Sequence, residues 1–511
     1  MITMPLLVLA AVAVPAYVVC LLVYRLCLSP LAHLPGPRLA AATHWVEFYY
    51  DVVRRGQYVF KIREWHQKYG PIIRINPSEV HIHDARFLTT TVFTTSTAKR
   101  RAKGPISTRV FGSPAAAIAT SDHETHRLRR GAISRSFSKD SVRRVEPIIR
   151  AALARMFARM ETHERSGQPL TISLLYSAFT ADVITEYAFA RSTNYLELPD
   201  LNKKFFDMMV SVHEMGALAR QYGWFLPLLN ALPNCIVTAL EPGMREFFVF
   251  QDEMRNRIRE VKAANKTGFY EKLAHETVFH EILDSSLPAK EKTVERLWQE
   301  AQIVSIAGTE TTAWTLSVIT YHLLSAPDVL EKLRAELSTV PETASWTDVE
   351  KLPYLTATIQ EGLRLSHGVT SRLQRACPDE VVSYNDGGAV YNIPAGTPVS
   401  TSAPLYHLDP ATFPDPYRFR PERWLEEGGR RLDRYLWSFG KGSRQCLGMN
   451  LAYAELCLCL TGVFRRYGGQ GDKGRVMELA GTTIEDVELK YDLFVPFPKT
   501  DSEGVRVVLT G

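Results

Sequence analysis

One short segment of the chain holds the residues that are best suited to chemistry, namely residues 439–448, FGKGSRQCLG. A thiolate is the ligand form of cysteine, and nearby N–H groups and cations favour it. Gly440 and Gly442 can adopt positive φ, which lets the chain turn sharply and direct N–H groups at the sulfur of Cys446. The segment therefore predicts a thiolate held as a ligand, against the plainer alternative of a buried structural cysteine.

The neighbours of Cys446 have chemistry that suits a bound cofactor. Phe439 offers an apolar wall that would keep water from the sulfur, and Arg444 offers a fork that can bind a carboxylate. Gly448 would let the following helix approach a flat cofactor with no side chain between them. These residue types together favour a cofactor site over a lone buried thiol.

A second motif, AGTETT at residues 307–312, interrupts an otherwise apolar helix. Gly308 inside a helix costs about 1 kcal/mol relative to alanine, so we expect a compensating role such as a groove that admits a small ligand. Thr311 can donate a hydrogen bond back to the carbonyl of Ala307 and loosen the helix there. The plainer alternative is that the threonines only back-bond inside a buried helix, but the segment around Cys446 favours the groove.

A third pattern places an acid and a base three residues apart on one helix face, at Glu361 and Arg364. Such a pair alone is usually a weak contact at the surface. A second basic segment follows at residues 419–424, FRPERW, and contains Arg423. The acid–base pair and the basic segment indicate a particular structure only in combination with the other two motifs.

The three motifs, in this order, resemble those of the cytochrome P450 monooxygenases, the haem-thiolate family. The resemblance spans nearly the whole chain and implies a mainly α fold with small β-sheets. It also implies haem b as cofactor, with its iron bound by Cys446. Glu361, Arg364 and Arg423 would then form a buried structural network.

The same resemblance assigns roles to the interrupted helix. Ala307 and Gly308 would border the oxygen-binding groove. Glu310 and Thr311 would relay protons while dioxygen is cleaved. Residues near Phe111, Val304, Val369 and Thr482 would face the substrate.

Haem carries two propionates, and the resemblance suggests which cations bind them. Arg444 comes from the cysteine segment, and Arg375 is the candidate from the segment after Glu361. Arg130 is the candidate from a third segment, together with His126, which stands where the family often has tryptophan and could donate from its ring.

The function implied is monooxygenation of a hydrophobic small molecule with O2. Electrons would come from NADPH through a separate NADPH-cytochrome P450 reductase, because the sequence has no Gly-rich dinucleotide site. Residues 49–51, 68–77 and 122–123 look like those of filamentous-fungal members of natural-product pathways, which suggests a terpenoid or polyketide-derived substrate. Two alternatives are a haem-thiolate isomerase or dehydratase and a non-catalytic haem-binding membrane protein; the acid–alcohol pair speaks against both.

Composition narrows the class of protein further. The chain of 511 residues has a formal net charge of only +5, which gives no reason to expect a nucleic-acid partner. Its seven cysteines are an odd number at irregular spacings, which is typical of a reducing compartment rather than of a disulfide framework.

The N-terminus has the composition of a membrane anchor. Residues 4–24 lack charged side chains and are long enough to span a bilayer, and basic residues follow them but do not precede them. A cleaved signal peptide is the alternative, but the basic n-region and the small-residue cleavage site are missing. We expect a single-pass protein of the endoplasmic reticulum membrane with a cytosolic body: an anchor at 1–28, a proline-rich hinge at 29–40 and one catalytic domain at 41–511.

The elements that must position these residues are mostly helices. Apolar residues recur every three or four positions in 123–137, 146–161, 295–325 and 326–337. Strand patterns are fewer and fall at 72–75, 80–82, 381–384, 389–393 and 489–494. The sequence NDGG at residues 385–388 predicts a hairpin turn between two of these strands.

Overall fold

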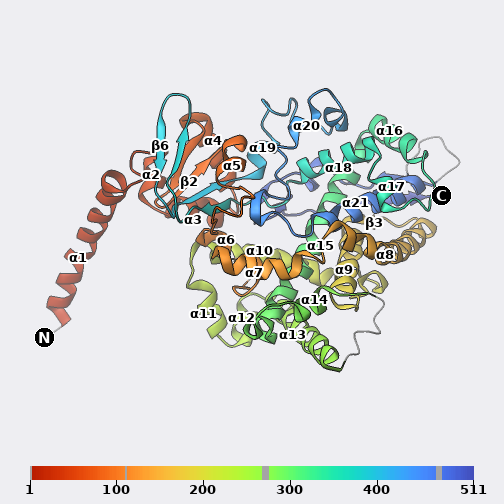
Figure 1. The fold of residues 1–511 in the computed structure, drawn as a ribbon, viewed down its shortest axis with the longest axis horizontal. Coiled ribbons are helices and arrows are strands. Elements are labelled where there is room, and N and C mark those ends of the chain that lie inside the picture. The colour runs from red at the N-terminus through yellow and green to blue at the C-terminus, as the bar shows by residue number, and fades with distance from the viewer. Residues whose placement is uncertain (1–2, 110–111, 268–274, 468–474) are drawn as a thin grey trace.

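A computed structural model describes residues 3–109, 112–267, 275–467 and 475–511. The first helix, α1 (Thr3–Val23), projects away from the body of the molecule (Figure 1) and continues into a short π-helical turn, Tyr24–Leu28. The segment Ala11–Leu28 has a mean hydropathy of 2.1 and is not buried, so it is long and apolar enough to cross a membrane.

The part of the body next to α1 is rich in β-structure. Its sheet has the strand order β1-β2-β7-β4, formed by β1 (Ile72–Asn76), β2 (Glu79–Ile82), β7 (Pro398–Thr401) and β4 (Leu373–Ala376). A hairpin of β5 (Val382–Asn385) and β6 (Val390–Ile393) lies beside it. The predicted turn between these strands is confirmed, with Gly387 at φ +93°. Short helices surround this part: α2 (Arg38–Ala42), α3 (Trp45–Phe48), α4 (Tyr58–Tyr69), α5 (Ala85–Thr91) and α19 (Ala403–His407).

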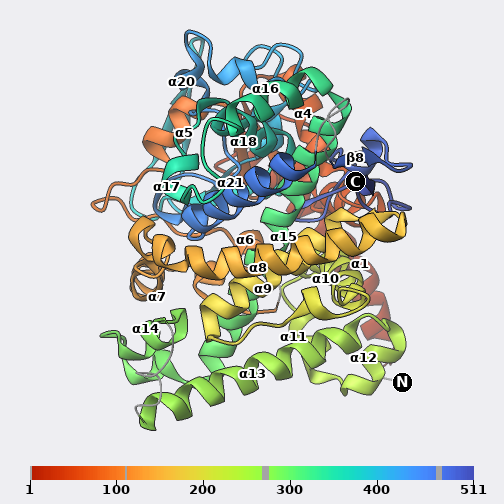
Figure 2. The same cartoon turned by 90° about the vertical axis from the view of Figure 1, so that its right-hand side faces the viewer.

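The rest of the molecule is helical and is built around α15 (Val294–Ser325). Helix α9 (Ile172–Phe189) packs along it, and α13 (Met244–Thr267), α18 (Pro353–Ser366) and α21 (Met449–Arg466) also contact it. Figure 2 shows α18 and α21 on one side of α15 and α13 on the other.

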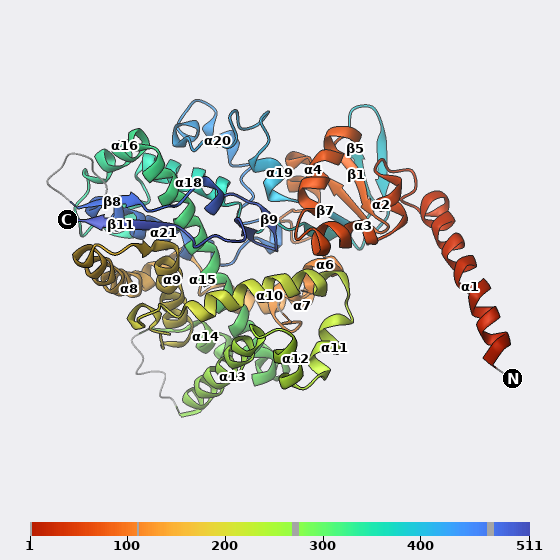
Figure 3. The same cartoon turned by 180° about the vertical axis from the view of Figure 1, so that it is seen from behind.

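The remaining helices cover this core. They are α6 (Pro105–Thr108), α7 (His123–Ser134), α8 (Lys139–Ser166), α10 (Lys203–Gln221), α11 (Phe225–Ala231), α12 (Asn234–Leu240), α14 (Val278–Asp284), α16 (Pro327–Leu337), α17 (Trp346–Val349) and α20 (Gly429–Leu432). Seen from behind, α10 lies between the β-rich part and α12 and α13 (Figure 3). A three-stranded sheet joins β3 (Leu170–Thr171), β11 (Arg506–Thr510) and β8 (Val476–Leu479). The mainly α fold with small β-sheets is the predicted class.

The four predicted helices are present, and one predicted strand is shorter than expected. The pattern at 489–494 forms only β9 (Tyr491–Asp492), which pairs with β10 (Pro496–Phe497). The chain turns between them at Phe494, whose φ is +88°. A left-handed residue ends the strand, which an alternation pattern does not reveal.

Two pairs of buried histidines predict that the fold is sensitive to acid. His66 and His81 are joined by a hydrogen bond of 2.7 Å, and His367 and His407 by one of 3.2 Å. Burial lowers the pKa of His66 and of His367 to about 3, from an ordinary value of 6.5, and it lowers the pKa of His81 and His407 well below the ordinary value.

Since the folded-state pKa is depressed, the unfolded chain binds more protons below pH 6.5, and stability falls as the pH falls. Below pH 6.5, each histidine adds about 1.4 kcal/mol per pH unit to the slope of the free energy of unfolding against pH. We expect a clearly lower denaturant midpoint, followed by far-ultraviolet circular dichroism, at about pH 5.5 than at about pH 7.5. Replacing His66 and His81 together by Gln should make the slope shallower, and equal midpoints at the two pH values would contradict the prediction.

Candidate functional site

The segment around Cys446 forms a tight loop that leads into α21. Gly440 has φ +63° and Gly442 has φ +77°, as predicted. A Cβ on Gly442 would lie 2.2 Å from the carbonyl oxygen of Phe93, so only glycine fits. The N–H of Cys446 donates to the carbonyl of Phe439 over 2.8 Å, and α21 begins three residues after the cysteine.

The side chain of Cys446 is accessible although it lies deep in the molecule. Burial raises the pKa of its thiol above the ordinary value, while the N–H of Gly448 and the cation of Arg130 act in the opposite direction. The loop thus directs one N–H and one cation at the sulfur. A Cβ at Gly448 would meet no atom within 4 Å, so the space there is open, and Phe439 packs its ring on Tyr453 at 5.4 Å.

A group of basic side chains surrounds the loop. Its members come from distant parts of the chain, and all but Arg130 have a pKa that other members lower; they are Lys103, His126, Arg130, Arg375 and Arg444. Burial is the largest cause in each case, and it lowers the pKa of Arg375 to about 9 and that of His126 to about 2. Arg375 also lies on the ring of Phe93 at 4.9 Å. The buried guanidinium groups of Arg130, Arg375 and Arg444 favour binding of an anion.

Arg444 joins the cysteine loop to the start of α7. Its guanidinium donates to the carbonyls of Thr120 at 2.6 Å and Ser121 at 2.7 Å, directly before that helix. The helix is capped by Asp122, which accepts from the N–H of Thr125 at 2.8 Å. This contact places His126 and Arg130, one helical turn apart on α7, beside the loop. Lys103 was not among the predicted residues, and no motif in the sequence marks it.

The interrupted helix behaves partly as predicted. Thr311 donates back to the carbonyl of Ala307 over 3.0 Å. Ala307 is exposed and Thr311 is half-exposed, whereas Thr309 is only 2% exposed. One face of α15 is therefore accessible in the middle of a packed helix.

Gly308 lies against a neighbouring helix. A Cβ there would lie 2.5 Å from the side chain of Ile184 on α9, so the missing side chain makes room for that helix. The position of Gly308 beside an oxygen-binding groove stays a prediction. This close packing compensates for the cost of a glycine within the helix. The hydroxyl of Thr482 accepts from the N–H of Arg506 at 2.8 Å, on β11, and the placement of substrate-facing residues near Thr482 stays a prediction. Phe111 lies outside the described residues.

Glu310, the predicted acid, is bound to another helix. Both oxygens of its carboxylate accept from Nε2 of His213 on α10, at 2.9 and 3.1 Å. The sequence motif gave no sign of this partner.

The predicted structural network is present and larger than expected. Glu361 and Arg364 are both fully buried and form two hydrogen bonds, of 2.8 and 2.9 Å, and Arg423 donates to Glu361 over 3.1 Å. Trp424 adds a bond of 2.9 Å from its indole N–H. Burial alone would raise the pKa of Glu361, but the bonds from Arg364 and the charge of Arg423 lower it. Breaking such a buried network typically costs about 3–5 kcal/mol.

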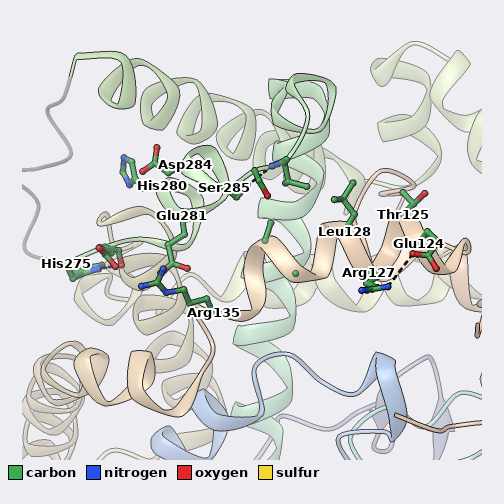
Figure 4. A pocket seen from close by; sticks show the side chains of 15 residues that line it. Glu124, Thr125, Arg127, Leu128, Arg135, His275, His280, Glu281, Asp284 and Ser285 are labelled. Atoms are coloured by element: carbon green, nitrogen blue, oxygen red, sulfur yellow. Dashed lines mark hydrogen bonds and ion pairs between the residues drawn. The ribbon is translucent and has the colours of Figure 1, made fainter. Parts of the chain in front are cut away.

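A separate cavity of about 1330 Å³ lies between α7 and α14 (Figure 4). Charged side chains of both signs line it, among them Arg127, Arg135 and Glu281. None of the predicted site residues lines this cavity. No group of histidine, cysteine and acidic side chains within the described ranges could hold a metal ion.

Comparison with known proteins identifies relatives of the whole chain. The family "Cytochrome P450" matches residues 36–480. The cytochrome P450 monooxygenase tpcC of Cochliobolus heterostrophus is 43% identical over 95% of this chain and 94% of its own length. The N-acetyltryptophan 6-hydroxylase ivoC of Emericella nidulans is 42% identical over 96% and 95%. The cytochrome P450 monooxygenase TRI4 of Trichoderma arundinaceum is 36% identical over 96% and 93%.

Proposed function

The chain belongs to the cytochrome P450 family and is a monooxygenase, and we propose that it inserts one oxygen atom from O2 into a hydrophobic secondary metabolite, of terpenoid or polyketide origin. Proteins of this family bind haem b and use O2 and electrons derived from NADPH. The relatives are named monooxygenases and hydroxylases, which speaks against the isomerase and the non-catalytic alternatives.

The residues around Cys446 fit haem, and this fit is the observation that carries the proposal. An accessible cysteine with an N–H and Arg130 directed at it suits an iron ligand, and the buried cations suit two propionates. We assign the ligand to Cys446 and propionate contacts to Arg130, Arg375, Arg444 and His126. Lys103 joins them as a candidate. When bound, haem supplies the oxygen chemistry, which a thiolate ligand promotes by donating electron density.

We assign the proton transfers to side chains on the accessible face of α15. The hydroxyl of Thr311 donates to Ala307, and rotation about its C–O bond would let it donate to a reacting oxygen atom instead. Glu310, the residue directly before Thr311 in the sequence, is the proposed acid. Ala307 is exposed beside Thr311, so the face between them is open to a small ligand. General acid–base assistance of this kind typically contributes on the order of a hundredfold or more.

We assign the electrons to an NADPH-cytochrome P450 reductase and the location to the endoplasmic reticulum membrane, with α1 as anchor and residues 41–511 as a cytosolic catalytic domain. The apolar helix and the basic residues after it support this orientation. Exposed apolar side chains on α11 and α12, and directly before α11, would add contact with lipid: Trp224 is 60% exposed, Leu228 52% and Leu240 75%.

Removing residues 1–28 should release most of the protein from microsomes and leave haem binding intact, because α1 projects away from the body. The measurement is the fraction in the soluble pool after ultracentrifugation, with the carbon monoxide difference spectrum as the control for haem. We expect some residual attachment through α11 and α12. Loss of haem on truncation would show that this segment belongs to the fold.

The substrate is tested by coexpression with a reductase and mass spectrometry of fed compounds. Terpenoid and polyketide metabolites should gain one oxygen atom. N-acetyltryptophan should be fed as well, because a relative is named as its hydroxylase. Oxidation of N-acetyltryptophan alone would replace the proposed substrate class, and rearrangement or water loss without oxygen gain would favour the isomerase or dehydratase alternative.

A further inference from the structure

The acid on α15 is held by a buried histidine from α10. Nε2 of His213 lies 2.9 and 3.1 Å from the two oxygens of Glu310, which stands 97 residues further along the chain. The His213 side chain is fully buried, and that of Glu310 is 19% exposed. An ionised carboxylate can only accept, so Nε2 carries the hydrogen of this bond.

The imidazole of His213 is also held by packing. Its ring meets that of Phe497, on β10, edge to face at a centroid distance of 5.4 Å. Contacts with the carboxylate and with this ring restrict the histidine to one orientation. The carboxylate of Glu310 is in turn restricted by a charge-assisted bond, which is stronger than a neutral one.

The position of α10 is set by other links as well. Glu214, the next residue, pairs with Arg55 over 2.5 Å, and Arg220 donates to the hydroxyl of Ser371. Neither link involves α15. Ser211 also donates to Glu241, and the carbonyl of Arg220 accepts from Arg109. Of these hydrogen bonds, the one from His213 reaches the proposed acid.

We propose that His213 is a positioning residue for proton delivery: it holds the carboxylate of Glu310 in place and makes that placement depend on where α10 lies. This inference rests on the proposed role of Glu310. A movement of α10 away from α15 would remove the hydrogen-bond donor and leave the carboxylate free to rotate. No residue of the sequence motif performs this task.

Without an organic substrate, O2 can be reduced either to hydrogen peroxide or to water. Reduction of O2 to hydrogen peroxide takes two electrons and two protons, which is one NADPH per O2. Reduction to two molecules of water takes four electrons and four protons, which is two NADPH per O2. Poor proton delivery therefore moves the ratio of NADPH to O2 toward one. This ratio can be measured without an organic substrate.

The experiment uses the full chain with haem and excess reductase, with NADPH and O2 as the only reactants. His213→Leu and Glu310→Gln should each lower the ratio of NADPH to O2, and the double variant should lower it no further, because the two residues act as one unit. His213→Gln, which keeps an N–H donor, should restore most of the wild-type ratio. Val212→Ala is the matched control, since it opens a gap at the neighbouring buried position on α10 and leaves both His213 and Glu310 in the chain.

A second measurement does not depend on turnover. Hydrogen exchange in peptides from 203–221 should rise about tenfold in His213→Leu and in Glu310→Gln, and no further in the double variant, as expected for loss of one charge-assisted bond. Additive increases in the double variant would overturn the pairing.

The remaining outcomes distinguish a failure of the positioning role of His213 from a failure of the proposed role of Glu310. A wild-type ratio in His213→Leu with a lowered ratio in Glu310→Gln would leave Glu310 as the acid and reduce His213 to a packing residue. A lowered ratio in Val212→Ala with wild-type hydrogen exchange in peptides from 203–221 would ascribe the effect to core packing and not to the bond from His213, and would overturn the positioning role. A wild-type ratio in Glu310→Gln would overturn the acid and the inference with it, whereas loss of the thiolate spectrum in wild type would overturn the proposed ligand.

Discussion

Cys446→Ser is expected to abolish the red-shifted Soret band that the reduced protein gives with carbon monoxide. That band requires a thiolate on the iron, and a serine hydroxyl does not ionise under the same conditions. Cys446 is the accessible cysteine in the loop whose Gly448 N–H and nearby Arg130 favour a negative sulfur. We expect complete loss of the band, with any remaining haem shifted to the position of an oxygen or nitrogen ligand.

Two other cysteines provide matched controls on α21, the helix that follows the loop. Cys457 and Cys459 are buried, and burial raises the pKa of Cys457 to about 12 and that of Cys459 well above the ordinary value. They are therefore neutral thiols packed in the core. Cys457→Ser and Cys459→Ser should keep the red-shifted band. A band that survives in Cys446→Ser and disappears in either control would show that the ligand is assigned to the wrong cysteine.

Thr311→Ala should leave the thiolate spectrum and substrate binding nearly unchanged but divert reducing equivalents to hydrogen peroxide. The substitution removes a hydroxyl from the accessible face of α15 and little apolar surface. Product formed per NADPH consumed, with reductase in excess, should fall by a factor on the order of a hundred if the hydroxyl acts as general acid.

Thr309→Ala separates this role from a loss of helix structure. Thr309 makes the same kind of back-bond, to the carbonyl of Ser305 at 2.7 Å, but its side chain is buried. The substitution Thr309→Ala should lower the free energy of unfolding and leave the amount of product formed per NADPH unchanged. Equal coupling in Thr311→Ala and wild type would contradict the relay and favour an enzyme that does not cleave dioxygen.

Local residue patterns were enough to predict much of this protein. The positive φ of Gly440 and Gly442 follows from their place in a loop that must turn sharply around one side chain. Helices appeared where apolar residues recur with the helical period, because that spacing produces one buried face wherever the helix packs. The pair Glu361 and Arg364 was predictable because three residues separate neighbours on a helix.

Tertiary structure alone decided which faces meet. Gly308 fits the side chain of Ile184, and Glu310 binds His213, although neither partner lies near in sequence. Lys103 joins the buried cations, and Trp424 completes the network of Glu361, without a motif that marks either residue. A periodic pattern reports that a helix has an apolar face but not which helix covers it. Contacts between distant segments depend on the packing of all elements together, and this packing determines which polar groups are buried side by side.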